Sequence, residues 1–173
     1  MTRTVRVAAS CAFVALLVSA CSSSDASTGG TYTLAFPSTA AAVATDFIQV
    51  LVFDAPASGD ARATFCQTLI KARLAKEQLS PSASGAEMPI CEALIQPNRR
   101  PVVIPYGDKA VLAVARRQTS PGKLEDFLIG CNIQTFGDGS APLPVSLSLV
   151  DIASSVPRTD CAALSDWCGQ KCR

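Results

Sequence analysis

The sequence contains no histidine among its 173 residues. This absence excludes Ser-His-Asp and Cys-His catalytic arrangements, and it removes the commonest general acid/base and metal ligand. A catalytic site would have to be built from carboxylates, lysine or tyrosine alone. We therefore predict no catalytic residues, no metal site and no cofactor.

Aromatic and charged residues are also scarce, at 6% and 17% of the chain. Few aromatics argue against a platform on which nucleic-acid bases could stack, and the formal net charge of +1 leaves no basic footprint for a polyanion. Hydrophobic residues make up 49% of the chain, which favours a packed core over disorder. The composition predicts one folded domain that does not bind nucleic acid.

The amino terminus has the pattern of a signal peptide. Arg3 and Arg6 precede an apolar run of 14 residues, 7–20, which is too short to cross a hydrocarbon core of about 30 Å as a helix. A short positive segment followed by such a run is typical of a secretory signal, here residues 1–20. No other apolar run in the sequence is long enough to span a membrane.

The signal ends in Leu17-Val-Ser-Ala-Cys21, where small residues precede a cysteine. This segment resembles the lipobox of bacterial lipoproteins. The resemblance implies cleavage after Ala20 and a thioether-linked diacylglyceryl group on Cys21, whose acyl chains, palmitate among them, would make the membrane a partner. Two or more acyl chains anchor a protein firmly where one binds only marginally. The alternative is an ordinary secretory signal in which Cys21 is incidental.

Residues 21–30 are small and polar after the cysteine and end in two glycines, which is typical of a flexible tether. Such a segment has a typical span of roughly 15–18 Å. Residue 22 is serine rather than the aspartate that retains many lipoproteins in the inner membrane. By that resemblance we expect a membrane-anchored protein of the bacterial cell envelope, with the outer membrane favoured over the inner. Without residues 1–20 the chain carries 13 basic and 14 acidic residues, so the tethered part is nearly neutral.

Residues 31–173 are expected to form a single mainly-β domain. Apolar runs and alternations bounded by Pro and Gly predict strands, and three- and four-residue apolar spacings predict one helix over 61–79, with Asp60 as N-cap and Pro81 beyond its end. Most of 80–100 is expected to be loop. The expected strands are 31–36, 47–53, 102–104, 110–115, 127–133 and 145–150, with a turn at Gly107-Asp108 between the third and the fourth. About seven short strands with one inserted helix favour a β-sandwich.

Two stretches carry a family resemblance. Val103 to Ala115, with its Pro-Tyr-Gly turn, resembles the hairpin of transthyretin-like and immunoglobulin-like envelope domains. The segments Ala-Phe-Pro-Ser-Thr (35–39) and Phe-Leu-Ile-Gly-Cys (127–131), together with the cysteine-rich tail, are similar to those of a group of myxobacterial lipoproteins. The resemblance implies a β-sandwich and an envelope location, and it implies no activity.

Six cysteines remain if Cys11 leaves with the signal and Cys21 is lipidated: Cys66, Cys91, Cys131, Cys161, Cys168 and Cys172. An even number in an exported domain predicts disulfides, with fifteen possible pairings. Because three lie in the body and three in the tail, an odd number of bridges must join the two, so the tail from Ser154 onward is pinned. Our preferred pairing is Cys66 with Cys91. A zinc site would need Cys-x2-Cys spacing, which the tail lacks, and a catalytic thiol would have no base.

Several motif matches have simpler interpretations. Ser120-Pro-Gly-Lys123 matches the Ser-x-x-Lys pattern of penicillin-binding proteins, but Pro-Gly between its ends predicts a hairpin turn. Asp138 between two glycines is interpreted as a turn rather than a calcium loop. Glu125 and Asp126 are adjacent, so on a strand they would face opposite sides and make a poor acid/base pair. They are interpreted as a solvated edge.

The basic pairs Arg99-Arg100 and Arg116-Arg117 are interpreted as solvated strand ends, with contact to lipid headgroups or an acidic partner as the alternative. Trp167, next to Cys168, is expected to pack beside the disulfides, with a partner contact as the alternative.

These observations favour a lipid-anchored envelope protein whose domain has a structural or binding role rather than an enzymatic one. Binding residues on such folds lie in loops, so 80–100 and 137–144 are the segments of interest. The alternatives are an inhibitor of a secreted enzyme, which would use a rigid loop, and a histidine-free carboxylate enzyme. The last would need two acids roughly 5–10 Å apart.

Overall fold

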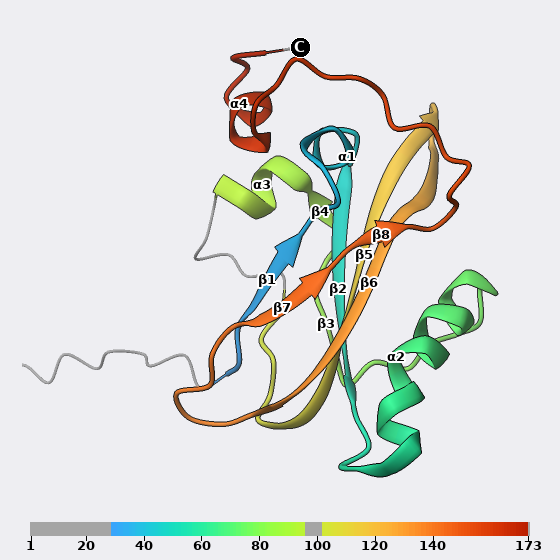
Figure 1. Cartoon of the computed structure of the whole chain (residues 1–173), viewed down its shortest axis with the longest axis vertical. Coiled ribbons are helices and arrows are strands. Elements are labelled where there is room, and N and C mark those ends of the chain that lie inside the picture. Colours follow the sequence, from blue (N-terminus) through green and yellow to red (C-terminus); the bar gives the residue numbers. More distant parts are fainter. Residues whose placement is uncertain (1–28, 96–101, 173) are drawn as a thin grey trace, which may run out of the picture.

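A computed structural model describes residues 29–95 and 102–172. Cys21 with most of the tether, and the pair Arg99-Arg100, lie outside the described residues. In chain order the elements are β1 (Tyr32–Ala35), α1 (Thr39–Val43), β2 (Phe47–Asp54), α2 (Gly59–Leu74), β3 (Ala83–Ser84), β4 (Met88–Pro89), α3 (Ile90–Ile95), β5 (Gly107–Ser120), β6 (Lys123–Phe136), β7 (Leu143–Ser146), β8 (Ser148–Leu149) and α4 (Leu164–Cys168) (Figure 1).

The centre of the fold is an antiparallel sheet of six strands in the order β3-β2-β5-β6-β8, with β4 also paired to β2. β5 and β6 form one long hairpin whose turn uses Gly122 at a φ of 76°, a conformation that favours glycine. Ala110 to Ala115 in β5 are all buried. An unbroken apolar run is expected for a strand that is covered on both faces.

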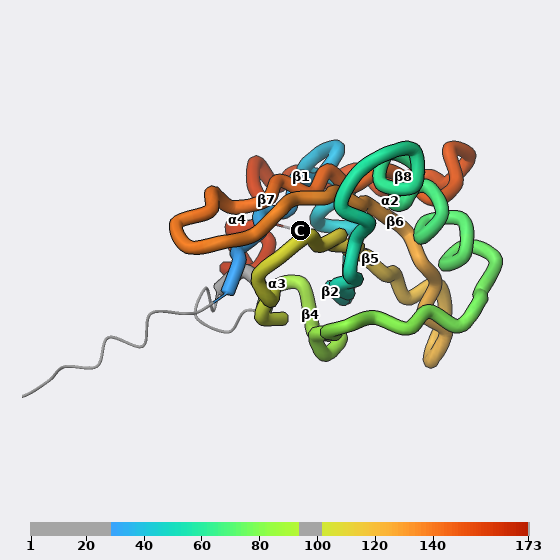
Figure 2. The backbone as a smooth tube through the Cα atoms, turned by 90° about the horizontal axis from the view of Figure 1, so that it is seen from below, coloured from blue at the N-terminus to red at the C-terminus, as the bar shows by residue number. Residues whose placement is uncertain are grey.

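The two faces of this sheet pack against different elements. In β2, Ile48, Val50 and Val52 belong to one core cluster, which includes residues of β1 and β7. Leu51 and Phe53 of the same strand belong to the other cluster, which includes Leu69 of α2. Figure 2, seen from below, has α2 on the right and β1 and β7 on the left. The molecule is therefore layered, with the main sheet in the middle.

The second sheet consists of β1 and β7, paired in parallel. β7 passes so close to β6 that a Cβ on Gly130 would lie 2.2 Å from the backbone oxygen of Ser146. Glycine at position 130 is what allows the two backbones to approach. Leu147 donates its N–H to Ala35 O at 2.8 Å, after which the chain pairs with β6 at Ser148.

The predictions of a mainly-β fold, of two packed sheets and of a disulfide-pinned tail are confirmed. The predicted strand over 145–150 is interrupted at Leu147, because the chain changes its pairing partner there. The predicted strand over 102–104 is wrong. Only Ile104 makes a bridge, and its partner is Gly30 rather than β5. The described residues contain four helices where one was expected.

The expected helix over 61–79 forms as α2, with different ends. Its N-cap is Ser58 rather than Asp60. The helix stops at Leu74 because Lys76 adopts a φ of 58°, and the N–H of Glu77 then reaches Ala72 O at 2.9 Å. These are the left-handed residue and the return hydrogen bond of a Schellman motif, a helix terminator that usually employs glycine. Because Lys76 occupies the position that usually holds glycine, the sequence pattern did not indicate this end of the helix.

The close crossing of β6 and β7 generates a stability prediction. Gly130→Ala should lower the free energy of unfolding by about 2–3 kcal/mol, because the new methyl group meets backbone that cannot yield by changing rotamer. The matched control is Gly137→Ala, where an added Cβ meets nothing within 4 Å. The control should stay within about 0.5 kcal/mol of the parent chain. Denaturant unfolding of the two variants measures the difference, and equal midpoints would contradict the close crossing.

Candidate functional site

The six cysteines from Cys66 to Cys172 form three disulfides. Cys66–Cys131 joins α2 to β6, Cys91–Cys168 joins α3 to α4, and Cys161–Cys172 lies within the tail. One bridge therefore runs from body to tail, as parity requires. The preferred pairing of Cys66 with Cys91 is wrong. Cys66 lies on the helix that packs against β6, whereas Cys91 lies on α3, which contacts α4.

An apolar cleft, which we name the tail cleft, lies between the end of β1, α1 and the carboxyl-terminal tail. Its volume is about 650 Å³, within the usual range for small-molecule sites. No lining side chain can titrate, since Cys168 is in a disulfide. The lining residues are Leu34, Phe36, Ser38, Thr39, Ala42, Ala162, Ala163, Leu164, Ser165, Cys168 and Gly169. Such a lining can bind an apolar group, and it supplies no acid or base for catalysis.

The tail supplies one wall of this cleft and is held in place by few contacts. Leu164 packs against the main core, and Thr39 donates its hydroxyl hydrogen to Ala162 O at 3.3 Å. The Cys91–Cys168 disulfide attaches α4 to the body, where Figure 1 places it above α3 and to the left of α1. The cysteine parity predicted a pinned tail, but no sequence pattern located the cleft, because its walls come from segments more than a hundred residues apart.

A second group of polar residues, the charged cluster, consists of Arg73, Glu87, Arg116 and Asp126. Arg73 donates two hydrogen bonds to the Asp126 carboxylate, from Nε at 2.7 Å and from a terminal nitrogen at 2.9 Å. Arg116 pairs with Glu87 at 3.1 Å, and its Nε lies 3.3 Å from Asp126 Oδ1 in a charge contact that lacks hydrogen-bond geometry. The hydrogen bond with Asp126 raises the pKa of Arg73, against the opposing effect of burial.

The charged cluster joins α2 to β5 and β6 rather than offering a free acid. Both carboxylates are engaged by arginine side chains. The surrounding cleft, of about 640 Å³, is lined by equal numbers of positively and negatively charged side chains. Its cations are Arg73, Lys76, Arg116 and Lys123, and its acids are Glu77, Glu125, Asp126 and Asp151. The interpretation of Glu125 and Asp126 as a solvated edge is correct for Glu125 only, since Asp126 is half-buried.

The discounted motifs lie in turns. Ser120 and Lys123 face each other across the β5–β6 hairpin turn, and Lys123 pairs with Glu125 at 2.6 Å, which lowers the pKa of that carboxyl. Asp138 is in a turn closed by the N–H of Gly137, which bonds to the Ser140 hydroxyl oxygen at 2.8 Å. Within the described ranges, no three or more Cys, Asp or Glu side chains are grouped as metal ligands.

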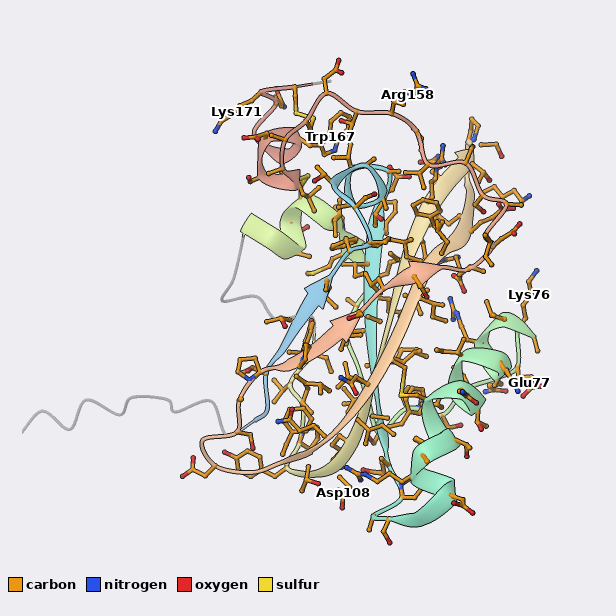
Figure 3. The ribbon with its side chains drawn as sticks, in the orientation of Figure 1. Lys76, Glu77, Asp108, Arg158, Trp167 and Lys171 are labelled. Atoms are coloured by element: carbon orange, nitrogen blue, oxygen red, sulfur yellow. A yellow bond between two sulfur atoms is a disulfide. The ribbon has the colours of Figure 1, made fainter. Side chains whose placement is uncertain are left out.

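Arg117 and Trp167 both lie near the tail. The guanidinium of Arg117 lies 5.6 Å from the centre of the Phe127 ring and donates to Ser155 O at 3.2 Å, so Arg117 is a packed residue rather than a solvated strand end. Trp167 precedes Cys168 on α4, with 38% of its surface exposed, and borders a small cleft with Pro157 and Arg158 (Figure 3). It therefore lies beside the disulfide and is only partly covered.

Comparison with known proteins gives no match to a family model, to a curated protein or to a solved structure. Among the described residues, no helix is both long and apolar enough to cross a membrane. A function for this chain therefore has to be inferred from its own residues and their arrangement.

The charged cluster predicts that neutralising Asp126 destabilises the protein, whereas neutralising its neighbour Glu125 does not. Asp126→Asn should reduce the free energy of unfolding by about 1 kcal/mol, the scale of a partly solvent-screened ion pair, because Arg73 and Arg116 both lose their anionic partner. Glu125→Gln, on the exposed side of the same strand, should leave the unfolding midpoint unchanged. Urea unfolding at neutral pH compares the two, and equal effects would contradict the cluster.

The structure of the tail cleft predicts that the Cys91–Cys168 disulfide holds α4 to the body and that the Cys161–Cys172 disulfide does not. Replacing Cys91 and Cys168 by serine should cost about 4 kcal/mol of stability, because that bridge closes a loop of 77 residues, and should free α4 from the body. Replacing Cys161 and Cys172 should cost about 3 kcal/mol and leave α4 attached, since that loop spans only 11 residues. Non-reducing unfolding gives the stabilities, and limited proteolysis with mass mapping detects release of the tail from Ser154 onward. Equal protection of the tail in both double variants would contradict this assignment.

Proposed function

We propose that this protein is a bacterial lipoprotein whose disulfide-stapled domain serves as a non-enzymatic binding module of the cell envelope. Acyl chains on Cys21 hold it to a membrane, and the outer membrane is the favoured location. The tether of residues 21–30 joins that anchor to the domain. The tail cleft is the candidate binding surface.

One observation carries this proposal. All six cysteines that remain after Cys11 and Cys21 are in disulfides, and such bonds persist in oxidising compartments outside the cytosol. Cys11 and Cys21 are the two that the lipobox interpretation sets aside, one for removal and one for lipidation. The pairing and the lipobox thus give the same account of all eight cysteines in the chain.

The arrangement of the two ends of the domain supports a binding role. β1 begins at the lower end of the sheet, where the chain arrives from residue 29, and α4 lies at the upper end (Figure 1). A domain anchored through its amino terminus would hold its lower end near the bilayer. The tail cleft would then face away from the membrane, toward a partner.

The contacts favour binding over the alternative functions. The tail cleft has no titratable lining, and the carboxylates of the charged cluster are engaged by arginines. Segment 80–100, which the sequence marked as a candidate binding loop, is held to the sheet over its described part, because β3 and β4 pair with β2.

The anchor is tested with Cys21→Ser. In the parent, the mass of the purified native protein should equal residues 21–173 plus acyl groups, less six hydrogens for three disulfides. The parent should sediment with membranes, while Cys21→Ser should lose the acyl mass and sediment much less, because the acyl chains supply the anchoring. Cys11→Ser is the matched control and should leave the mature mass and membrane association unchanged. A native chain that begins at Met1 with free thiols would overturn the proposal.

A further inference from the structure

The domain has a defined point at which the tether enters. Gly30 donates its N–H to Ile104 O at 2.8 Å, and a Cβ on Gly30 would lie 2.0 Å from the Phe136 ring. A Cβ on Gly29 would lie 2.8 Å from Val103. The two glycines are therefore packed into the lower end of the domain. The tether leaves from a fixed position beside the segment 102–106.

Segment 102–106 exposes two large apolar side chains to solvent. Val102 and Ile104 are buried, at 6% and 0% exposure, and they fix the backbone between them. Val103, between the two, is 66% exposed, and Tyr106 is 43% exposed. These are two of the five large hydrophobic side chains that stand exposed in the described part of the chain. Both lie within a few residues of the contact between Ile104 and Gly30.

The charges around this end are largely paired. Arg62 binds Asp108 at 2.8 Å, and Lys109 binds Asp54. A hydrogen bond from Thr135, and secondarily Arg62, lower the pKa of Asp108, so it stays ionised and paired. Asp138 adds one exposed carboxylate in the β6–β7 turn. Among the residues that the structure describes here, few charges are unpaired, and such a surface with exposed Val and Tyr suits a zwitterionic lipid interface better than a polyanion.

The tether between Cys21 and Gly29 is short enough to keep this surface close to a membrane that holds Cys21. Only eight positions separate Cys21 from Gly29, which is at most about 27 Å when fully extended. Flexible segments of that length typically span roughly 14–17 Å. The residues around the tether entry are therefore the part of the domain closest to the anchored lipid.

Resting on the proposed function, we propose that Val103 and Tyr106 contact the bilayer, with both side chains seated among zwitterionic phospholipid headgroups. Tyrosine is enriched at membrane interfaces because its ring is apolar and its hydroxyl is polar. The acyl chains supply the anchoring, and these two side chains supply a second contact that fixes the orientation of the domain. The sheet then stands with the tail cleft directed away from the membrane.

Fluorescence quenching in vesicles tests this contact. The acylated full-length mature protein is reconstituted into phosphatidylcholine vesicles that carry brominated acyl chains near the headgroups. The single native tryptophan, Trp167, lies at the opposite end of the molecule from Asp108 (Figure 3) and should not be quenched. The double variant Tyr106→Trp with Trp167→Phe moves the only indole to position 106. Its emission should shift to the blue and be quenched several-fold more strongly than that of Trp167.

Adding Val103→Asp to that double variant should reduce the quenching toward the level of Trp167. Val103→Leu in the same background is the matched control and should preserve it. Protein that floats with the vesicles while the indole at position 106 stays unquenched overturns this contact and leaves the anchor in place. Quenching that Val103→Asp does not reduce overturns the role of Val103. Protein that carries no acyl mass and does not float with the vesicles overturns the proposed function and this contact together.

Discussion

The fold depends on the removal of both faces of the central sheet from water. Ile48, Val50 and Val52 in β2 are fully buried on one face, while Leu51 and Phe53 are buried on the other, against α2. Apolar burial is the main favourable contribution to folding, and a central strand covered on both sides contributes twice along the same backbone. Each outer layer keeps its place by covering this sheet: α2 on one side, β1 and β7 on the other.

The disulfides attach the elements that this burial holds least firmly. Cys66–Cys131 joins α2 to β6, and Arg73 of the same helix pairs with Asp126 of β6, so a covalent bond and an ion pair both hold this helix to the sheet. Cys91–Cys168 attaches the tail, whose helix α4 has no fully buried residue. A small helix with so little buried surface would not be expected to stay docked through packing alone. The tail cleft thus depends on an oxidised bridge, consistent with the proposed envelope location.

The two ends of the molecule have different chemistry. The lower end has paired charges around Val103 and Tyr106, and it receives the tether between Ile104 and Phe136. The upper end has a cleft without titratable groups, bordered by Trp167 on the neighbouring surface. The proposed lipid anchor at the amino terminus would give this polarity a direction relative to the membrane. In the proposed function, the lower end orients the domain and the upper end meets the partner.

The sequence by itself determined the features that depend on neighbouring residues. The continuous apolar runs of β2 and β5, the Pro-Gly hairpin turn at 121–122 and the presence of a helix at α2 follow from local patterns, and each was correctly predicted. Cysteine parity required a bridge between body and tail, because an odd number on each side cannot close within itself. Boundaries were less certain where an unusual residue took a special conformation, as Lys76 does at the end of α2.

Only the tertiary structure decided which distant segments meet. Pairing of Cys66 with Cys131, over 65 residues, follows from α2 lying on β6, and nothing near either cysteine indicates it. Segment 102–104 has the composition of a strand, yet Ile104 bridges Gly30 because β2 and β6 already occupy both edges of β5. Asp126 was indistinguishable from Glu125 in sequence, and it became the partner of Arg116 through the β5–β6 register and of Arg73 through the placement of α2. Contacts of this kind depend on how layers stack, which no local pattern encodes.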